Sequence, residues 1–381
     1  MDTYVSPWMD DELAIFRDAI VKFVEAEMLP HDASWRKQQH VGAEIWRKAG
    51  AARLLCTDVP EQFGGGGGDF RHEAILYAEL GRRGLSGFGQ GVHSICAHYL
   101  VNHGTDAQRR RFLPRMARGE LIGAIGMTEP SAGSDLQGIR TRALRDGDEY
   151  VINGSKIFIT NGYLAGLIAL VVKTTPGEGA KGTSIILVET AELPGFRVGR
   201  ILDKMGMKAQ DTAELFFDDV RVPVANLLGG SEGQGFYQLM GDLPYERALI
   251  AVAGVGAMEG GLDATIAYVK DRRAFGQSIA EFQNTKFKLA ELATKTRVAR
   301  VFVDDCIGRI VAGTLDTLTA SMAKYWVSEV QQEVLDECVQ LHGGYGYMND
   351  YLVCRLFADA RVQRIYGGTN ELMKILISRA L

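Results

Sequence analysis

The chain has 381 residues, a length that can bury more than one hydrophobic core and that predicts two or three domains. Apolar residues make up 46% of the chain and charged residues 23%, which excludes disordered and fibrous proteins. The formal net charge of -5 supplies no positive field for nucleic acid or an anionic membrane, and no apolar run approaches the roughly 18 residues of a membrane-spanning helix.

Residues 1–122 predict an N-terminal helical domain. Between Met9 and Leu29 apolar side chains recur every three or four residues, which predicts a helix that ends at Pro30. Residues 73–82 and 107–119 show the same period. The glycine run at 64–68 lacks the Gly-Lys-Ser/Thr ending of a phosphate loop, so it predicts a surface turn.

Residues 123–233 change to the alternating pattern of strands. Residues 150–152 and 156–160 flank Asn153-Gly154, which predicts a β-hairpin because this dipeptide accepts the positive φ of a tight turn. Further strands are expected at 167–173, 183–189, 196–201 and 213–222. After a glycine-rich boundary at 229–235, residues 234–381 return to helical periodicity. No repeat of fixed period occurs, which excludes solenoids and propellers, and the alternation of strand and helix of a doubly wound sheet is absent.

Cysteine and histidine suggest neither disulfides nor metal binding. The five cysteines are an odd number without a Cys-x-x-Cys pair, and His93, Cys96, His98 and His103 do not share one helical face. The segment before Met9 lacks the basic residues of a signal or transit peptide, so we expect a cytoplasmic protein.

The glycines at 254–260 resemble a dinucleotide turn only superficially. The third glycine is one residue late and the flanking pattern is helical, so these small residues predict a close approach of another helix. No Gly-x-Ser-x-Gly or His-Glu-x-x-His motif is present, which argues against serine hydrolase and zincin mechanisms.

Three polar, glycine-rich stretches suggest ligand binding. They read GMTEPSAGSDLQG at 126–138, QLHGGYGY at 340–347 and YGGTNE at 366–371. The first exposes hydroxyls and backbone N–H groups that suit a polar ring or a phosphate. In the second, Gln340 precedes a glycine pair that allows a ligand to approach the backbone closely.

Together these stretches resemble the acyl-CoA dehydrogenase family, flavoenzymes that oxidise the α,β bond of fatty acyl thioesters. The first stretch resembles one family signature, and residues 340–359 resemble a second. KIFITNG at 156–162, RRAFGQ at 272–277 and Phe282-Gln283 also fall in the family's order, so the resemblance covers essentially the whole chain.

The resemblance implies an α+β fold that is mostly α. It consists of an N-terminal helical domain (1–122), a middle β-barrel (123–233) and a C-terminal four-helix bundle (234–381), with FAD between barrel and bundle. Family positions that contact FAD match Ile125, Met127, Thr128, Ser134, Phe158, Thr160, Thr369 and Glu371. A neighbouring subunit contributes those that match Arg272, Phe275, Phe282, Gln283, Gln340, Gly343 and Gly344. This arrangement implies at least a dimer, and a homotetramer is usual in the family.

The catalytic base departs from the majority pattern of the family. Most members carry a carboxylate at the position of Gly367, whereas the long-chain and isovaleryl branches carry it at the position of Glu246 and have glycine at the other. The resemblance therefore implies Glu246 as the base, the Gly367 N–H as a donor to the thioester carbonyl and Arg247 as a catalytic or positioning residue. Substrate contacts are expected from Ser134, Tyr245, Arg247 and Gly368.

The expected activity is FAD-dependent dehydrogenation of a fatty acyl-CoA to the trans-2-enoyl-CoA, with electrons passed to an electron-transfer flavoprotein. Glu246 would remove the α-proton while flavin N5 takes the β-hydride. Residues 243–251, 339–348 and 360–374 resemble the long-chain branch more than the isovaleryl branch. Two alternatives stay open: an acyl-CoA oxidase that uses oxygen, and a catalytically silent flavin- or CoA-binding protein.

Overall fold

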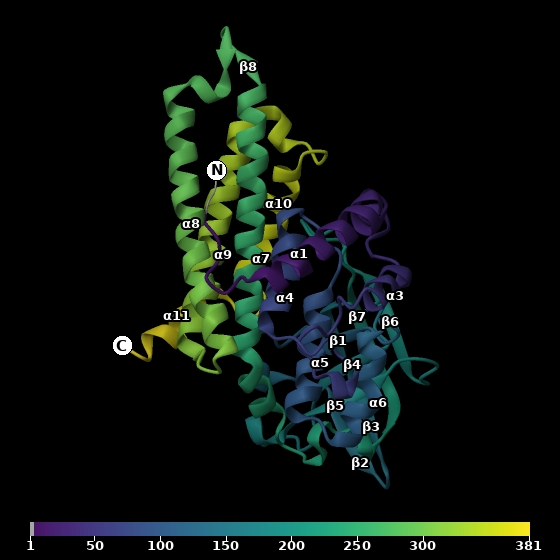
Figure 1. Cartoon of the computed structure of the whole chain (residues 1–381). Coiled ribbons are helices and arrows are strands. Elements are labelled where there is room, and N and C mark those ends of the chain that lie inside the picture. The colour runs from purple at the N-terminus through teal and green to yellow at the C-terminus, as the bar shows by residue number, and fades with distance from the viewer. Residues whose placement is uncertain (1–3) are drawn as a thin grey trace.

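The computed structural model describes residues 4–381 and places a β-sheet between two groups of helices in the sequence (Figure 1). Side chains at the N-caps of three early helices bind the free N–H groups there: Asp10, Asp69 and Thr105. The helices of this part are α1 (Asp11–Phe23), α2 (Asp32–Gln38), α3 (Ala43–Ala51), α4 (Phe70–Arg82), α5 (Gln90–His103) and α6 (Asp106–Ala117).

The predicted end of the first helix at Pro30 is wrong. A π-helical turn (Val24–Met28) and a 3₁₀ turn (Leu29–His31) lead from α1 into α2 without a break into extended chain. Pro30 lies in the first turn of the 3₁₀ segment, where a missing backbone N–H costs no hydrogen bond. The glycine run at 64–68 does form a largely exposed turn, and Gly64 and Gly67 adopt positive φ there.

The middle of the chain forms one curled seven-stranded sheet. The strand order is β1-β4-β2-β3-β7-β6, and β5 pairs with β4. Every residue of β4 is buried, because β4 lies inside the sheet and beneath the helices. The strands are β1 (Gly123–Gly126), β2 (Arg142–Asp146), β3 (Glu149–Thr160), β4 (Leu167–Lys173), β5 (Thr183–Glu189), β6 (Phe196–Ile201) and β7 (Thr212–Pro223).

The hairpin predicted at Asn153-Gly154 is wrong, because β3 runs through this dipeptide as one strand of 12 residues. The pairing of β3 with β7 shifts register between Ile152 and Gly154, so the dipeptide forms a bulge. The Asn153 amide exchanges hydrogen bonds with Asp219 on β7. The turn that does join two strands contains Gly147, between β2 and β3.

The C-terminal part is a bundle of long helices. In Figure 1, α7, α8 and α9 run side by side, and the short β8–β9 hairpin lies at the far end of α7 and α8. The elements are α7 (Gly235–Asp271), β8 (Arg273–Ala274), β9 (Gln277–Ser278), α8 (Gln283–Val311), α9 (Thr317–His342), α10 (Leu352–Ala360) and α11 (Asn370–Ser378). Helix α10 completes the four-helix bundle, and α11 packs against α9.

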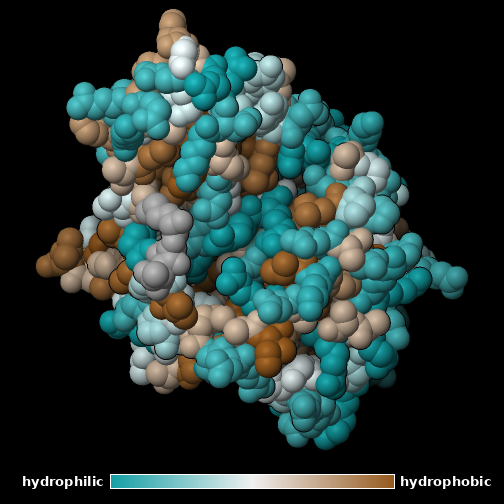
Figure 2. All heavy atoms as spheres, turned by 45° about the horizontal axis from the view of Figure 1, so that its top comes forward, coloured by the Kyte–Doolittle hydropathy of each residue, from teal (hydrophilic) through white to brown (hydrophobic). Residues whose placement is uncertain are grey.

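Helix α7 is longer and more apolar than the sequence pattern suggested. Among residues 4–381 it is the one helix that could cross a membrane by length and composition alone. In the fold, 67% of its most apolar window is buried inside the protein, which is the character of a core helix. The surface in Figure 2 is mostly hydrophilic, with hydrophobic residues in small separate groups.

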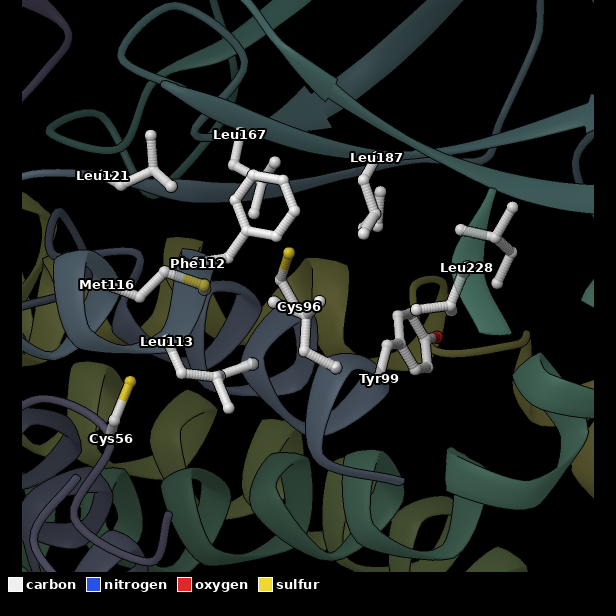
Figure 3. Close-up of a cluster of buried hydrophobic side chains, with 14 of the residues drawn as sticks. Cys56, Cys96, Tyr99, Phe112, Leu113, Met116, Leu121, Leu167, Leu187 and Leu228 are labelled. Carbon is white, nitrogen blue, oxygen red and sulfur yellow. The ribbon is translucent and has the colours of Figure 1, made fainter. Parts of the chain in front are cut away.

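A hydrophobic core joins the sheet to the N-terminal helices. Figure 3 shows Leu167 and Leu187 of the sheet facing Phe112 of α6 and Cys96 of α5. Each of these side chains has no exposed surface. This core fixes the position of α5, and Tyr99 of α5 lies at its edge.

The glycines at 254–260 provide the predicted close helix approach. A Cβ atom at Gly256 would lie 2.4 Å from the Ala78 carbonyl oxygen of α4, and one at Gly260 would lie 1.9 Å from the Arg82 carbonyl oxygen. On the other side, a Cβ at Gly81 would lie 2.7 Å from the Ala253 oxygen of α7. Helices α4 and α7 therefore touch through their backbones.

Gly256→Ala should destabilise the protein by about 1–3 kcal/mol, because the added methyl group forces the two helices apart. Urea unfolding gives the difference. Gly308→Ala on α8 is the matched control, since Gly308 is exposed and a Cβ there meets nothing within 4 Å. The control should be neutral or more stable by up to ~1 kcal/mol. Equal effects of the two variants would contradict the close packing.

Candidate functional site

Glu246 is a buried carboxylate on α7, with 9% of its surface exposed. The Tyr99 hydroxyl of α5 donates a hydrogen bond of 2.7 Å to Glu246 Oε1. Burial raises the pKa of Glu246 to about 7, helped by the charge of Asp242 and opposed by Tyr99 and Arg247. A carboxylate with this pKa can accept or release a proton near neutral pH.

Asp242 lies one helical turn before Glu246 and also faces α5. Its carboxylate accepts hydrogen bonds from Asn102 Nδ2 at 2.6 Å and lies 3.1 Å from His103 Nε2. The α5–α7 contact thus carries two polar connections one turn apart. Sequence reasoning missed Tyr99 and Asp242, although the spacing of Tyr99, Asn102 and His103 along α5 marks a polar stripe on one helix face.

Tyr245 makes a third polar connection of α7. Its hydroxyl donates to Asp58 Oδ2 at 2.9 Å, and its ring stacks on His98 with centroids 3.9 Å apart. His98 Nε2 lies 2.9 Å from the same Asp58 oxygen. The sequence predicts a substrate contact for Tyr245, which precedes Glu246 in the chain and whose hydroxyl is bound to Asp58.

Gly367 faces the same stretch of α7 as the base. It has φ of +63°, and a Cβ atom there would lie 2.5 Å from Ile250 Cδ1. Ile250 lies one helical turn after Glu246 on the same face of α7, so a side chain at position 367 would lie near the Glu246 side chain. Within residues 4–381, the N–H groups of Gly367 and Gly368 donate to no protein acceptor. These two donors remain available to a ligand.

Arg247 is buried rather than part of a surface ion pair, with 3% of its surface exposed. Its Nη1 donates to Ser321 Oγ of α9 at 3.0 Å, and its Nε has no hydrogen-bond partner in the described chain. Burial lowers the pKa of its guanidinium. Thr369 caps α11 by accepting from the Leu372 N–H, and Glu371 is exposed in the first turn of that helix.

The loop after β1 contains the half-buried residues Met127 and Thr128. A buried ion pair holds it, because Lys156 Nζ of β3 lies 2.8 Å from Glu129 Oε1 and 3.0 Å from the Met127 carbonyl oxygen. Glu129 also accepts from the N–H groups of Arg140 and Thr141. Burial raises the pKa of Glu129, but Lys156 and the hydrogen bonds from Thr141 and Arg140 keep it below its usual value. Ile125 precedes this loop on β1, and Ser134 is exposed within it.

Phe158 and Thr160 extend from β3 beside that loop. Phe158 has φ of +61° at a second irregularity of the β3–β7 pairing, and 64% of its surface is exposed. An exposed aromatic residue with positive φ inside a strand is strained, which is typical of functional sites. Thr160 is half-buried at the end of the strand.

The remaining predicted cofactor residues lie elsewhere in the chain. Arg272 at the end of α7 is 26 residues from Glu246, which corresponds to about 39 Å along a helix. Phe275, in the neighbouring hairpin, is 95% exposed and has φ of +52°. One chain therefore does not bring this group together with the base: Arg272, Phe275, Phe282, Gln283, Gln340, Gly343 and Gly344.

The residues near β1 and β3 fit a flavin. An exposed aromatic side chain, the Thr128 and Thr160 hydroxyls and the backbone of the loop after β1 can contact a flat polar ring. No group of three His, Cys, Asp or Glu residues that could hold a metal ion occurs among residues 4–381. His93 is buried and accepts from the Gly123 N–H, and all five cysteines are free.

Comparisons with known proteins agree along the whole chain. Family models described as the N-terminal, middle and C-terminal domains of acyl-CoA dehydrogenase match residues 10–120, 124–220 and 233–381. The long-chain specific acyl-CoA dehydrogenase of Mus musculus mitochondria is 50% identical over 371 residues, which are 96% of this chain and 86% of that protein.

Solved structures give the same result. An acyl-CoA dehydrogenase from Geobacillus kaustophilus is 44% identical with a TM-score of 0.96, and each chain is 99% covered. A chain from a structure of the electron transferring flavoprotein of Acidaminococcus fermentans is 37% identical with a TM-score of 0.94. This match covers 100% of the present chain and 99% of the Acidaminococcus chain.

Lys156→Met should lower the free energy of unfolding by about 3–5 kcal/mol, because it leaves Glu129 charged and buried without its partner. Denaturant unfolding at neutral pH measures this change. Lys208→Met is the matched control, since the Lys208–Asp203 pair is exposed and is worth less than about 1 kcal/mol. A loss for Lys156→Met as small as that of the control would show that the ion pair does not hold the loop.

Proposed function

Because the chain belongs to the acyl-CoA dehydrogenase family, we propose that it oxidises a fatty acyl-CoA to the trans-2-enoyl-CoA with Glu246 as the base. The enzyme is an oxidoreductase. The observation that carries the assignment of the base is the buried carboxylate of Glu246 on α7 beside the Gly367 turn.

Glu246 removes the α-proton of the substrate. Its burial keeps the carboxylate poorly solvated, so the pKa near 7 gives it both an ionised fraction at neutral pH and real proton affinity. The Tyr99 hydroxyl holds Oε1, which leaves the second oxygen to meet the α-carbon. The side chain missing at Gly367 leaves space for the substrate opposite the base.

The unpaired Gly367 N–H donates to the thioester carbonyl oxygen and stabilises the charge that develops there. Arg247, buried next to the base, helps to position the substrate and to keep Glu246 ionised. Ser134 in the exposed loop and Gly368 complete the proposed substrate contacts, and Tyr245 acts through its stacking with His98.

FAD is the cofactor of this family, and when bound it accepts the β-hydride. We assign the flavin ring to Met127, Thr128, Phe158 and Thr160, whose exposure and chemistry fit it. The distant group around Arg272 and Phe275 would hold the adenosine half for a neighbouring subunit, because it lies too far from its own base. This assignment requires a dimer at least, and we propose a homotetramer.

The similarity to the mouse long-chain enzyme supports a long straight acyl chain as substrate. The similarity to a chain from the Acidaminococcus flavoprotein structure supports an electron-transfer flavoprotein as the acceptor. Anaerobic bleaching of the flavin by a series of acyl-CoAs would rank the substrates. Rapid peroxide formation in air would instead favour an oxidase, and a flavin band that survives every thioester would favour a silent binding protein.

Glu246→Gln should slow flavin bleaching by roughly 10²- to 10⁴-fold, because the amide cannot take the proton. The wild-type rate at limiting substrate should fall about tenfold per pH unit below the Glu246 pKa of about 7 and level off above it. Anaerobic stopped-flow spectroscopy measures both. A wild-type profile that stays flat from pH 5 to 8, or a variant with full rate, would remove the assignment.

The same variant should change stability with the opposite pH dependence. The folded pKa of Glu246 is raised above its ordinary 4.5, so its contribution to stability is present at low pH and is lost as pH rises towards 7. At pH 8 Glu246→Gln should therefore be more stable than wild type by about 3 kcal/mol, and at pH 4 the two should be nearly equal. Thermal unfolding at the two pH values checks this, and a difference independent of pH would contradict a buried, shifted carboxylate.

Moving the carboxylate from position 246 to position 367 tests whether side chains at the two positions can reach the same α-carbon of the substrate. Glu246→Gly with Gly367→Glu and Ile250→Val should recover part of the bleaching rate, because Ile250→Val removes the methyl group that a Cβ at 367 would meet. Without Ile250→Val the recovery should be smaller. Glu246→Gly with Ile250→Val alone should stay inactive, and activity in that control would show that another base operates.

A further inference from the structure

Two buried cations, Lys324 and Arg247, lie near each other, and Lys324 contacts the Gly367–Gly368 turn. Lys324 of α9 has no exposed surface, and Arg247 of α7 has 3%. The Lys324 ammonium donates to the Gly368 carbonyl oxygen at 2.7 Å and to Asn370 Oδ1 at 2.8 Å. Neither cation forms a salt bridge with a carboxylate in residues 4–381.

A buried cation without a carboxylate partner is costly to keep. Burial and the charge of Arg247 together lower the pKa of Lys324 to about 8, against the opposing effect of Glu371 and Glu329. An apolar side chain of similar length would avoid this cost. Packing alone therefore does not explain why a charged residue occupies position 324.

The position of the ammonium suggests that reason. By binding the Gly368 carbonyl, Lys324 holds a turn in which Gly367 and Gly368 both have positive φ. The Gly367 N–H in the same turn has no protein acceptor. The turn thus offers the unpaired Gly367 N–H to a ligand, while its Gly368 carbonyl oxygen contacts the buried ammonium of Lys324.

We propose that Lys324 is a positioning residue that orients the Gly367 N–H and, with Arg247, adds a positive field that stabilises negative charge on the substrate's thioester oxygen. The inference rests on the proposed function. When the α C–H bond breaks, the proton goes to Glu246 and the electron pair is delocalised onto the carbonyl oxygen. Lys324 lowers the energy of that enolate through the turn, without touching the substrate.

The test uses a ligand whose α-proton leaves without any redox step. A 3-oxoacyl-CoA carries its α-carbon between two carbonyls, and its enolate absorbs in the near ultraviolet. Titrating the complex with the FAD-loaded protein gives the apparent pKa of the bound ligand. In Lys324→Gln, which keeps an N–H donor for the Gly368 oxygen but no charge, this pKa should rise by roughly 1–2 units.

Asn370→Ser is the matched control, because it removes one anchor of Lys324 and keeps the ammonium. It should shift the ligand pKa by less than about 0.3 unit, a small change compared with the effect of a nearby charge. Equal shifts in the two variants would mean that Lys324 only shapes the turn, and no shift in Lys324→Gln would overturn the proposal.

Lys324→Arg provides a second test of the proposal if Lys324→Gln does not fold. Arginine remains protonated at all relevant pH values, so the ligand pKa should stay within about 0.3 unit of wild type. A rise of about one unit with the charge retained would overturn the proposal. Failure of the wild-type protein to bind or ionise the 3-oxoacyl-CoA would instead count against the proposed function itself.

Discussion

The burial of Glu246 between α5 and α7 is the constraint on which the site depends. A carboxylate in water has a pKa too low for an effective base, and removal from water is what raises it to about 7. Such burial is stable only if both helices are held firmly. The sheet–helix core fixes α5, as Figure 3 shows around Cys96 and Tyr99, and the backbone contact with α4 fixes α7.

Polar groups around the base limit the cost of its burial. Tyr99 donates to Glu246, and Asn102 and His103 engage Asp242 one turn away. The charge of Asp242 raises the pKa of Glu246, whereas the charge of Arg247 lowers it. Beside the same stretch of α7, the Gly367 turn contributes free donors. The proposed site therefore combines a proton acceptor on α7 with a neighbouring turn that can stabilise negative charge.

The second irregularity of β3 lies beside the loop after β1, in the region proposed to hold the flavin ring. The strand must run past the loop after β1, and the buried Lys156–Glu129 pair ties the two together. Close to this tie, Phe158 takes a strained conformation that exposes its ring. Rigid support on one side and a strained aromatic residue on the other are what a tightly held planar ligand requires.

The sequence by itself determined the order of the three parts and most of the strands, and its resemblance to the family led to the proposed pairing of Glu246 with Gly367. Residues 167–173, 183–189 and 196–201 were predicted to the residue. The first two are apolar runs of buried strands, and the third is a half-exposed strand, each bounded by turn residues. Asn153-Gly154 was misread, since the same φ preference suits a hairpin turn and a bulge, and only the partner strand β7 distinguishes them.

Only the tertiary structure decided which groups surround the base. Tyr99 of α5 contacts Glu246, and Lys324 of α9 contacts the Gly367–Gly368 turn, and the local pattern of α5 or α9 does not indicate these partners. Their roles depend on distance and burial, which arise when the helices pack. The sequence could thus propose Glu246 as the base, whereas the pKa of Glu246 and the groups packed around it are properties of the assembled fold.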